Sequence, residues 1–442
     1  MRRIYCVVLL ASAFLVSCGN DEGFTAAPTP SARLIVFNAI PASPDLNLET
    51  NNQRTGTISF AESTSDTAVL PQIALDFRVS FFSDRVEQTV LNDKFTLDIG
   101  FTQILILTGS LDLATAVKVV EPPFTYPDGS TDTRIRFMNA SSNVASATLT
   151  LTNPNGTGAT VAMTNGQPTG FSTQASGAGV QMEIRDTSSN ALLWRSGDFS
   201  LSAGADRFFI MTDYFGAGDG TVRMSSINDP SGTTIFQNEE IPSAVRFINQ
   251  TANQGQLDFL VDGALAASLN FGEVSEFVEF PESAVIVTVT PAGDATTELN
   301  SSERLLFRGA FASFHAAVSL TDETLVSTSI YGEDRRPVDA QATVNVTKLA
   351  PVVPLVDVYF QDAGEALSGG AELANLADFT SGPLAVPPNT YDLYVTEGGT
   401  TNILIGPQTI TVDSRGIYTI HIVEAAGGGE PIQLALLDDF QN

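Results

Sequence analysis

The chain repeats one order of strand-like segments four times, and this repetition limits the possible folds more than any other feature. Similar segments open the four units: ARLIVFNA at 32–39, RIRFMNA at 134–140, AVRFINQ at 244–250 and ATVNVTK at 342–348. A second apolar run follows each of them, and a β-rich run such as FTQILILTG closes each unit. With Asn38, Asn139, Asn249 and Thr347 as equivalent positions, a unit is about 100 residues long, the size of one small domain.

The apolar residues of these runs alternate with a period of two, which indicates strands with one buried face. In the third unit Val245 and Phe247 share one face, and Arg246 lies on the other. The stretch 371–379 could form a helix, but its place in the repeat favours a strand. Pairs such as Asp262-Gly263 stand between runs and suit tight hairpins. The sequence therefore predicts an all-β protein of four tandem immunoglobulin-like antiparallel β-sandwich domains.

The repeats also predict where the domains lie. We expect sandwiches at 32–122, 133–234, 243–335 and 341–442, named here repeats 1 to 4. The junctions between them are short and contain proline, so the array should be semi-rigid. Residues 18–31 are rich in Ala, Pro, Thr and Ser, which predicts a flexible tether before repeat 1.

Residues 1–17 have the order of an export signal, with two arginines, an apolar stretch too short to span a bilayer, and a small residue. The stretch Leu15-Val16-Ser17-Cys18 resembles the lipobox of bacterial lipoproteins, in which the cysteine carries the lipid and becomes the first mature residue. The resemblance implies lipidation of Cys18 and a membrane anchor that does not depend on the folded part. Gly19 in place of aspartate favours the outer membrane, with the periplasmic or surface face undecided. Cys6 leaves with the leader, so no disulfide is expected.

The chain is strongly acidic, with a net charge of −29 and three lysines, at 94, 118 and 348. Such a surface repels nucleic acid and anionic lipid, which excludes both as partners. Solubility, including in salty water, is one explanation of the acidity. Calcium binding is the other, with two candidate clusters, each on a domain junction: Asp128 with Asp132, and Glu333, Asp334 and Asp339. No other cofactor is expected.

Several runs resemble a domain of unknown function that occurs in tandem in bacterial envelope lipoproteins and cell-wall proteins. In that family an Ala-Ser-Pro-Asp turn precedes a Val-Asp-Val-Tyr strand. IPASPDLNL at 40–48 keeps the turn in repeat 1, and Val356-Asp357-Val358-Tyr359 keeps the strand in repeat 4. The likeness is strongest in repeats 3 and 4 and weakest in repeat 2. It implies β-sandwich repeats on an envelope protein, and it implies no activity or binding residue.

Catalytic motifs are missing from the sequence, and we expect no enzyme. No G-x-S-x-G elbow, H-E-x-x-H pair or phosphate-binding G-x-x-x-x-G-K is present. The two histidines, His315 and His421, belong to different repeats and lie opposite the apolar faces of their closing strands, so we predict solvated side chains. A shared catalytic or zinc-binding role for the two histidines would require contact between the sandwiches of repeats 3 and 4. The only tryptophan, Trp194, is expected in a core.

These features favour a non-catalytic lipid-anchored envelope protein, a binding or spacing module of tandem sandwiches, with an envelope protein or glycan as partner. One alternative is a glycan-directed accessory or hydrolytic protein, because a pair of glycosidase carboxylates leaves no local signature. A deep cleft with two neighbouring carboxylates would favour that alternative. Another is a purely structural stalk.

Overall fold

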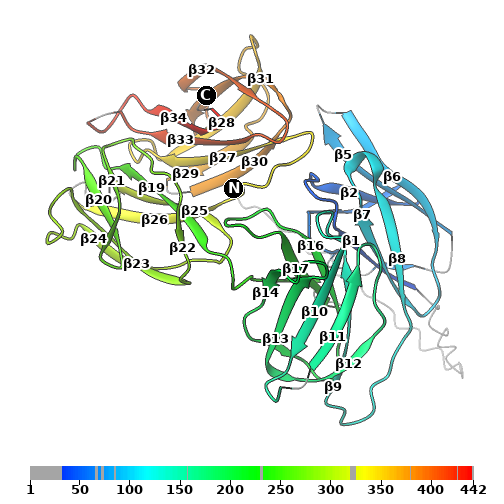
Figure 1. Cartoon of the computed structure of the whole chain (residues 1–442). Helices are drawn as coiled ribbons and strands as arrows, with labels where there is room; N and C mark the ends of the chain where they lie inside the picture. Colours follow the sequence, from blue (N-terminus) through cyan, green and yellow to red (C-terminus); the bar gives the residue numbers. More distant parts are fainter. Residues whose placement is uncertain are drawn as a thin grey trace, which may run out of the picture.

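The computed structural model describes residues 32–64, 68–70, 74–83, 86–156, 158–228, 232–318, 325–378, 380–425 and 427–440. Within these residues the regular structure is almost entirely strand, and the one helical element is the short 3-10 turn η1 (Leu111–Leu113). None of the described helical segments is long and apolar enough to cross a bilayer. The predicted all-β class, with tandem two-sheet sandwiches, is confirmed (Figure 1).

Each repeat consists of two sheets, of which the one that holds the opening and closing strands is called the front sheet. The strand orders of the front sheets are β4-β1-β7-β8, β12-β9-β16-β17-β18, β22-β19-β25-β26 and β30-β27-β33-β34. The bounds of these strands are, in repeat 1, β1 (Ala32–Asn38), β4 (Ala68–Leu70), β7 (Thr102–Thr108) and β8 (Thr115–Glu121); in repeat 2, β9 (Asp132–Asn139), β12 (Ser172–Ala175), β16 (Asp206–Asp213), β17 (Val222–Asn228) and β18 (Gly232–Phe236); in repeat 3, β19 (Ser243–Gln250), β22 (Val278–Phe280), β25 (Phe311–Val318) and β26 (Val326–Glu333); in repeat 4, β27 (Ala342–Leu349), β30 (Thr380–Val386), β33 (Ile417–Val423) and β34 (Gln433–Asp438).

The other sheet of each repeat is called the back sheet, and it begins with the second apolar run of the sequence pattern. The strand orders are β3-β2-β5-β6, β11-β10-β13-β14 with β15 beside β13, β21-β20-β23-β24 and β29-β28-β31-β32. The bounds are, in repeat 1, β2 (Leu46–Thr50), β3 (Gln53–Ile58), β5 (Ala74–Ser83) and β6 (Val86–Thr96); in repeat 2, β10 (Ser146–Thr152), β11 (Gly158–Thr164), β13 (Gly177–Asp186), β14 (Leu192–Arg195) and β15 (Phe199–Leu201); in repeat 3, β20 (Leu257–Val261), β21 (Ala264–Leu269), β23 (Ala284–Pro291) and β24 (Asn300–Leu305); in repeat 4, β28 (Leu355–Asp362), β29 (Leu373–Ala377), β31 (Asn389–Glu397) and β32 (Ile403–Val412). The strand expected within 371–379 is present as β29.

One strand pair in each front sheet is parallel, which the sequence pattern did not reveal. The opening strand pairs with the closing strand in the same direction, for example with Phe37 opposite Ile106 and Phe247 opposite Phe314. All other strand pairs among the described residues are antiparallel. A parallel pair needs a long connection. Here the strands between the opening and closing strands supply it.

The repeated asparagine has the same structural role in three repeats. The side-chain oxygens of Asn38, Asn139 and Asn249 accept hydrogen bonds from the backbone amides two residues later, at 3.0 to 3.1 Å. The side-chain amides donate to the turn that follows, for example Asn139 Nδ2 to the carbonyl of Val144 at 2.7 Å. This local bonding is the usual reason for asparagine in a turn. In repeat 4, Lys348 bonds to the carbonyl of Ala350 instead.

Each repeat has its own apolar core between the front and back sheets. A fifth apolar cluster lies between the front sheets of repeats 1 and 2, and we call it the apolar seam. The seam joins outward-facing residues of β1, β7, β9, β16 and neighbouring segments: Ile35, Phe37, Ala39, Phe60, Ala61, Ile104, Ile106, Val119, Met138, Ala140, Phe208, Ile210 and Ile227. The four units are therefore not independent, since burial of this surface stabilises the pair.

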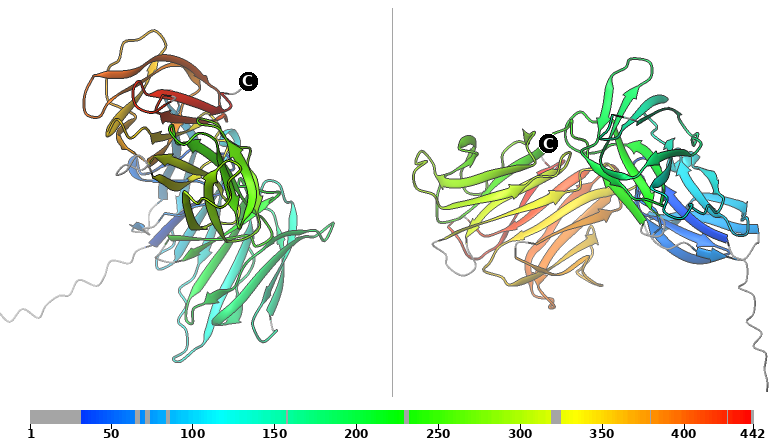
Figure 2. Two further views of the ribbon diagram at one scale, coloured as in Figure 1. Left: turned by 90° about the vertical axis from the view of Figure 1, so that its left-hand side faces the viewer. Right: turned by 90° about the horizontal axis from the view of Figure 1, so that it is seen from below.

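Repeats 3 and 4 also form a pair, so that the molecule consists of two pairs of sandwiches. Repeats 1 and 2 lie side by side, and repeats 3 and 4 form a second body next to them (Figures 1 and 2). The two front sheets of the second pair meet through polar side chains, as the contact between the rings of His315 and His421 shows. The sequence indicated a row of units, whereas the structure packs that row into two lobes.

Candidate functional site

A cavity with a volume of about 560 Å³ lies where repeats 1, 2 and 3 meet. We call it the three-repeat cavity. Repeat 1 supplies Asp45, Phe60 and Glu62, and the segment after β26 supplies Asp334 and Arg336. Further lining residues come from repeat 2, from the segment that follows it and from the connection between β24 and β25 of repeat 3, among them Trp194, Tyr214, Phe215, Arg223, Asn238, Arg308 and Gly309.

Tyr214 fixes the wall of the cavity where repeats 2 and 3 meet. Its hydroxyl lies 2.7 Å from the carbonyl oxygen of Ala217 and 2.8 Å from that of Gly309. A backbone bond from the amide of Ala217 to the Gly309 carbonyl, at 2.8 Å, crosses the same junction. Beside it, Arg308 Nε lies 2.9 Å from a carboxylate oxygen of Glu239. These contacts hold repeat 3 at a defined position against repeat 2.

Exchange of Gly309 for alanine is expected to loosen this junction. Its backbone φ is +76°, and an added Cβ would lie 2.2 Å from the Tyr214 hydroxyl oxygen. Gly263→Ala is the matched control, because its φ is +81° and no atom lies within 4 Å of an added Cβ. Left-handed strain should cost both variants about 1–2 kcal/mol, and the clash should cost Gly309→Ala about 1–3 kcal/mol more. Urea denaturation measures the difference, and equal midpoints would refute the packing role of Gly309.

Arg336 joins the segment after β26 to repeat 1. Its Nη1 donates a hydrogen bond of 2.6 Å to the carbonyl of Ser43, and its guanidinium carbon lies 5.5 Å from the centre of the Phe60 ring. Further along, the amide of Asp339 donates to the carbonyl of Ala42 at 2.7 Å. The third junction therefore lies against repeat 1 and closes one side of the cavity.

The acidic side chains of the cavity are more exposed to solvent than its arginines. The carboxylate residues Asp45, Glu62 and Asp334 are exposed, whereas the arginines Arg223, Arg308 and Arg336 are half-buried. Burial lowers the pKa of Arg223 and of Arg336, because a guanidinium loses hydration there. The interior is thus cationic and the rim is anionic.

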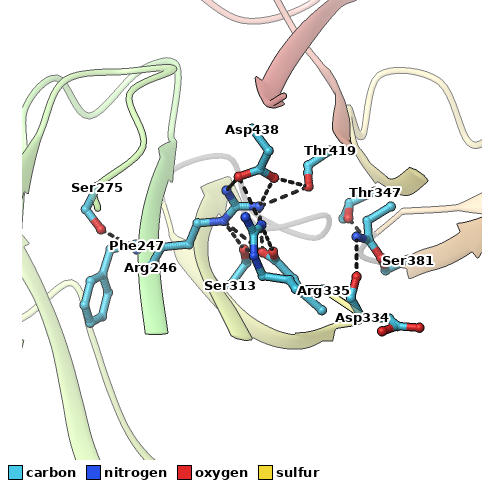
Figure 3. A network of polar contacts seen from close by, with 12 residues as sticks. Arg246, Phe247, Ser275, Ser313, Asp334, Arg335, Thr347, Ser381, Thr419 and Asp438 are labelled. Atoms are coloured by element: carbon cyan, nitrogen blue, oxygen red, sulfur yellow. Dashed lines mark hydrogen bonds and ion pairs between the residues drawn. The ribbon is translucent and has the colours of Figure 1, made fainter. Parts of the chain in front are cut away.

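A second polar feature, called the polar seam, joins the front sheets of repeats 3 and 4 (Figure 3). Arg246 on β19 is 4% exposed, and its guanidinium lies 2.8 Å from a carboxylate oxygen of Glu333 and 3.0 Å from one of Asp438. Arg335 Nη1 contacts the same two carboxylates at 3.3 and 3.0 Å. Ser313 and Thr419 add hydroxyl groups, at 2.9 and 3.1 Å from Arg246 nitrogens.

The two histidines belong to this seam, so the prediction that they are solvated is wrong. Both are buried, and their ring centres are 5.2 Å apart. His315 also packs against Tyr331, at 5.2 Å between the ring centres. Burial, followed by the positive charge of Arg246, lowers the pKa of His421 to about 3. Burial lowers the pKa of His315 in the same direction, with contributions from His421 and Arg246.

The structure gives the three proposed calcium ligands of the third junction separate partners. Glu333 is the last residue of β26 and pairs with the two arginines of the polar seam. Asp334 Oδ1 accepts the backbone amide of Arg336 at 3.0 Å, and Asp339 lies 2.6 Å from Arg415. In the first junction Asp128 and Asp132 are exposed. Within the described residues no group of three or more His, Cys, Asp or Glu side chains could hold a metal ion.

Trp194 and Cys18 are the other two positions singled out from the sequence. Trp194 is buried in the core of repeat 2, as expected. Cys18 lies outside the described residues, as do the signal peptide and the tether.

No sequence signal pointed to Arg223, Tyr214 or Arg336 as site residues, and Arg246 was identified only as a residue on the polar face of its strand. One signal was available for the apolar seam, because β1 and β7 are apolar on both faces (LIVF and ILIL), which is typical of strands buried on two sides. No local pattern marks the cavity, since its residues come from three repeats.

Comparisons with known proteins give a partial family match and distant structural similarities, and they add no activity. A family model described as "Domain of unknown function (DUF4397)" matches residues 243–359, which is repeat 3 and the first strands of repeat 4. No curated protein matches the chain. The solved structures similar to the chain include two that share little sequence identity with it. The Bacillus anthracis TIE protein is 12% identical with a TM-score of 0.16, over 90% of this chain and 68% of that one. The major pilin subunit of Bacillus cereus is 10% identical with a TM-score of 0.15, over 66% of this chain and 99% of that one. The expected resemblance to a domain of unknown function is therefore confirmed for residues 243–359.

Proposed function

We propose that the chain is a non-catalytic, lipid-anchored protein of the bacterial cell envelope that acts as a rigid binding and spacing module. One observation supports the proposal most directly: contacts join the repeats to one another. These contacts are the apolar seam, the polar seam and the hydrogen bonds of Tyr214 and Arg336. A flexible row would change shape freely, whereas a body joined in this way keeps a fixed geometry. The fixed geometry also maintains the three-repeat cavity, because residues of three different repeats line it.

The anchor is proposed to be a lipid on Cys18, with residues 18–31 as the tether and the outer membrane as the site. One acyl chain binds a membrane weakly, and the two or three of a lipoprotein hold durably. The folded repeats then stand away from the bilayer and face an envelope protein or glycan. The acidic surface disfavours nucleic acid as a partner.

Replacement of Cys18 by alanine is expected to release the protein from membranes, because only a thiol forms the thioether. The measurement is detergent-phase partitioning and membrane fractionation of the expressed full chain. Cys6→Ala is the matched control, since that thiol leaves with the leader, and it should remain with membranes. Retention of Cys18→Ala in the membrane fraction would contradict lipid anchoring.

A glycan-directed accessory or hydrolytic protein is the second candidate, and the three-repeat cavity with its acidic rim favours it. Release of reducing ends from envelope glycans would support hydrolysis, and binding without release would support the accessory role. A purely structural stalk remains the third candidate. A stalk should retain neither envelope glycans nor co-purifying proteins, whereas the proposed module should retain one of them.

A further inference from the structure

Arg223 is the group in the three-repeat cavity that most needs a ligand. It lies on β17 and lines the cavity, and its Nε is buried without a hydrogen-bond partner among the described residues. It forms no ion pair within the part of the chain that the structure covers. A buried guanidinium nitrogen that lacks a hydrogen-bond partner is costly, and a carboxylate is the partner that fits the planar fork of arginine best.

Arg336 adds to the positive potential at the same place. The charges of Arg336 and Arg223 disfavour each other, which shows that the two guanidinium groups are close enough to interact. Glu62 opposes this effect on Arg223, but its side chain is exposed, and Arg308 already pairs with Glu239. Asp45 and Asp334 act in the same way on Arg336. Arg223 therefore has a neighbouring cation and no direct ion-pair partner among the described residues, and an anionic group of a ligand would supply that partner.

The distant acidic residues of the chain do not prevent anion binding here. Exposed charges act over about 8 Å at physiological ionic strength, so the surface carboxylates far from the cavity are screened. The rim acids Asp45, Glu62 and Asp334 are solvated, and they also provide oxygens that can accept hydrogen bonds from hydroxyl groups of a ligand.

The size and walls of the cavity indicate more than a simple ion. A volume of about 560 Å³ lies in the range of sites for small organic ligands. Phe60 and Phe215 pack edge to face in the lining, with 5.6 Å between their ring centres, and offer an apolar surface. A ligand that combines one carboxylate, several hydroxyl groups and an apolar ring face suits these walls.

We propose that the three-repeat cavity binds a sugar acid of the uronic acid type, with its carboxylate on Arg223 and its ring face toward Phe60 and Phe215. The ligand is a free sugar acid or a unit of an acidic polysaccharide. This proposal rests on the binding role proposed above and names the ligand class for it.

A smaller cavity supports the polysaccharide as the source. It has a volume of about 250 Å³ and shares Asp45, Asp334 and Arg336 with the three-repeat cavity. Its other walls come from Pro44 of repeat 1, from repeat 4 and from Val338 in the segment before it. A chain of sugar units could therefore extend from one cavity into the next past Arg336.

Titration calorimetry of the full-length protein in detergent tests the proposal, with glucuronate and an oligouronate as probes and glucose and a neutral oligosaccharide as controls. We expect saturable binding of the acidic probes and at least about ten-fold weaker binding of the neutral ones. Tighter binding of the oligouronate than of glucuronate identifies a polysaccharide as the source, and equal binding identifies a free sugar acid.

Arg223→Met removes the charge and keeps the apolar stem, and it should weaken binding of the acidic probes at least about ten-fold. Arg207→Met is the matched control, because Arg207 is also a half-buried arginine of repeat 2 but lines a different cavity. Arg223→Lys keeps a charge and should bind with intermediate affinity. Trp194 fluorescence reports whether each variant keeps repeat 2 folded.

Absence of saturable binding of both acidic probes would overturn the proposal. So would equal affinity for neutral probes, or an affinity that Arg223→Met leaves unchanged. These failures concern the ligand alone, since membrane partitioning of Cys18→Ala tests the anchoring function separately.

Discussion

Replacement of Arg246 by methionine is expected to destabilise the pair formed by repeats 3 and 4 by about 3 kcal/mol. The change leaves the carboxylates of Glu333 and Asp438, which are 6% and 9% exposed, without one of the two arginines that they contact. Removal of one partner from a buried ion pair typically costs 3–5 kcal/mol, because the remaining charge stays desolvated. Arg335 still contacts both carboxylates, so the lower end of that range is expected.

Urea denaturation of the full chain measures this effect with two probes. The only tryptophan, Trp194, is in the core of repeat 2, so its fluorescence reports on that repeat, whereas circular dichroism reports on all four. Arg246→Met should move part of the dichroism transition to lower urea and leave the fluorescence transition in place. Arg415→Met is the matched control, because Arg415 is 53% exposed in its pair with Asp339 and should cost less than about 1 kcal/mol. Equal midpoints for the two variants would contradict a stabilising polar seam.

Acidification from pH 7 to pH 5 is expected to destabilise the same pair by about 4 kcal/mol. His315 and His421 have lowered pKa values in the folded protein, to about 3 for His421. The unfolded chain binds a proton at each histidine near pH 6.5, and the folded chain does not, so stability falls as the pH decreases below that value. Each histidine contributes up to about 1.4 kcal/mol per pH unit.

Ionisable groups near the two histidines also affect how the stability of this pair of repeats depends on pH. Arg246 on β19 and Tyr331 on β26 face the pair. Burial raises the pKa of Tyr331, so its hydroxyl stays neutral between pH 7 and pH 5. Asp378 follows β29 and has a raised pKa caused by burial, so its protonation acts in the opposite direction. The effect of two histidines should exceed that of one carboxyl.

The double variant His315→Leu/His421→Leu separates the titration from the packing. Its absolute stability can differ from that of the wild type, but its slope against pH between 7 and 5 should be nearly flat. The fluorescence transition of repeat 2 is an internal reference, because that repeat contains no histidine. A wild-type dichroism midpoint that is the same at both pH values would refute the effect.

Much of the fold could be predicted from local sequence. The opening run RIRFMNA and the closing run DRFFIMTD became β9 and β16, and the alternation of Val245, Arg246 and Phe247 gave the correct core-facing residues. Even the repeated asparagine was informative, because its bonds stay within the adjacent turn. Period-two patterns and turn residues are local, so they can be identified without knowing the tertiary structure.

The candidate site could not be predicted in the same way. Arg223 and Tyr214 come from repeat 2 and Arg336 from the segment after β26, and only the packing of the repeats brings them to one cavity. Glu333 and Asp339 are close in sequence and looked like calcium ligands. Their actual partners are Arg246 and Arg415, which lie far away in the chain.

By itself, the sequence determined the number of units, the strands within them and the residues that fill each core, because burial of apolar side chains fixes which face of a strand points inward. It did not determine the environment of the polar face. The alternation in FASFHAAVSL places His315 opposite the core, and such a face can lie in water or against another polar sheet. Only the tertiary structure decided this, because the contact between repeats 3 and 4 depends on charges such as Arg246 and Asp438 that are 192 residues apart.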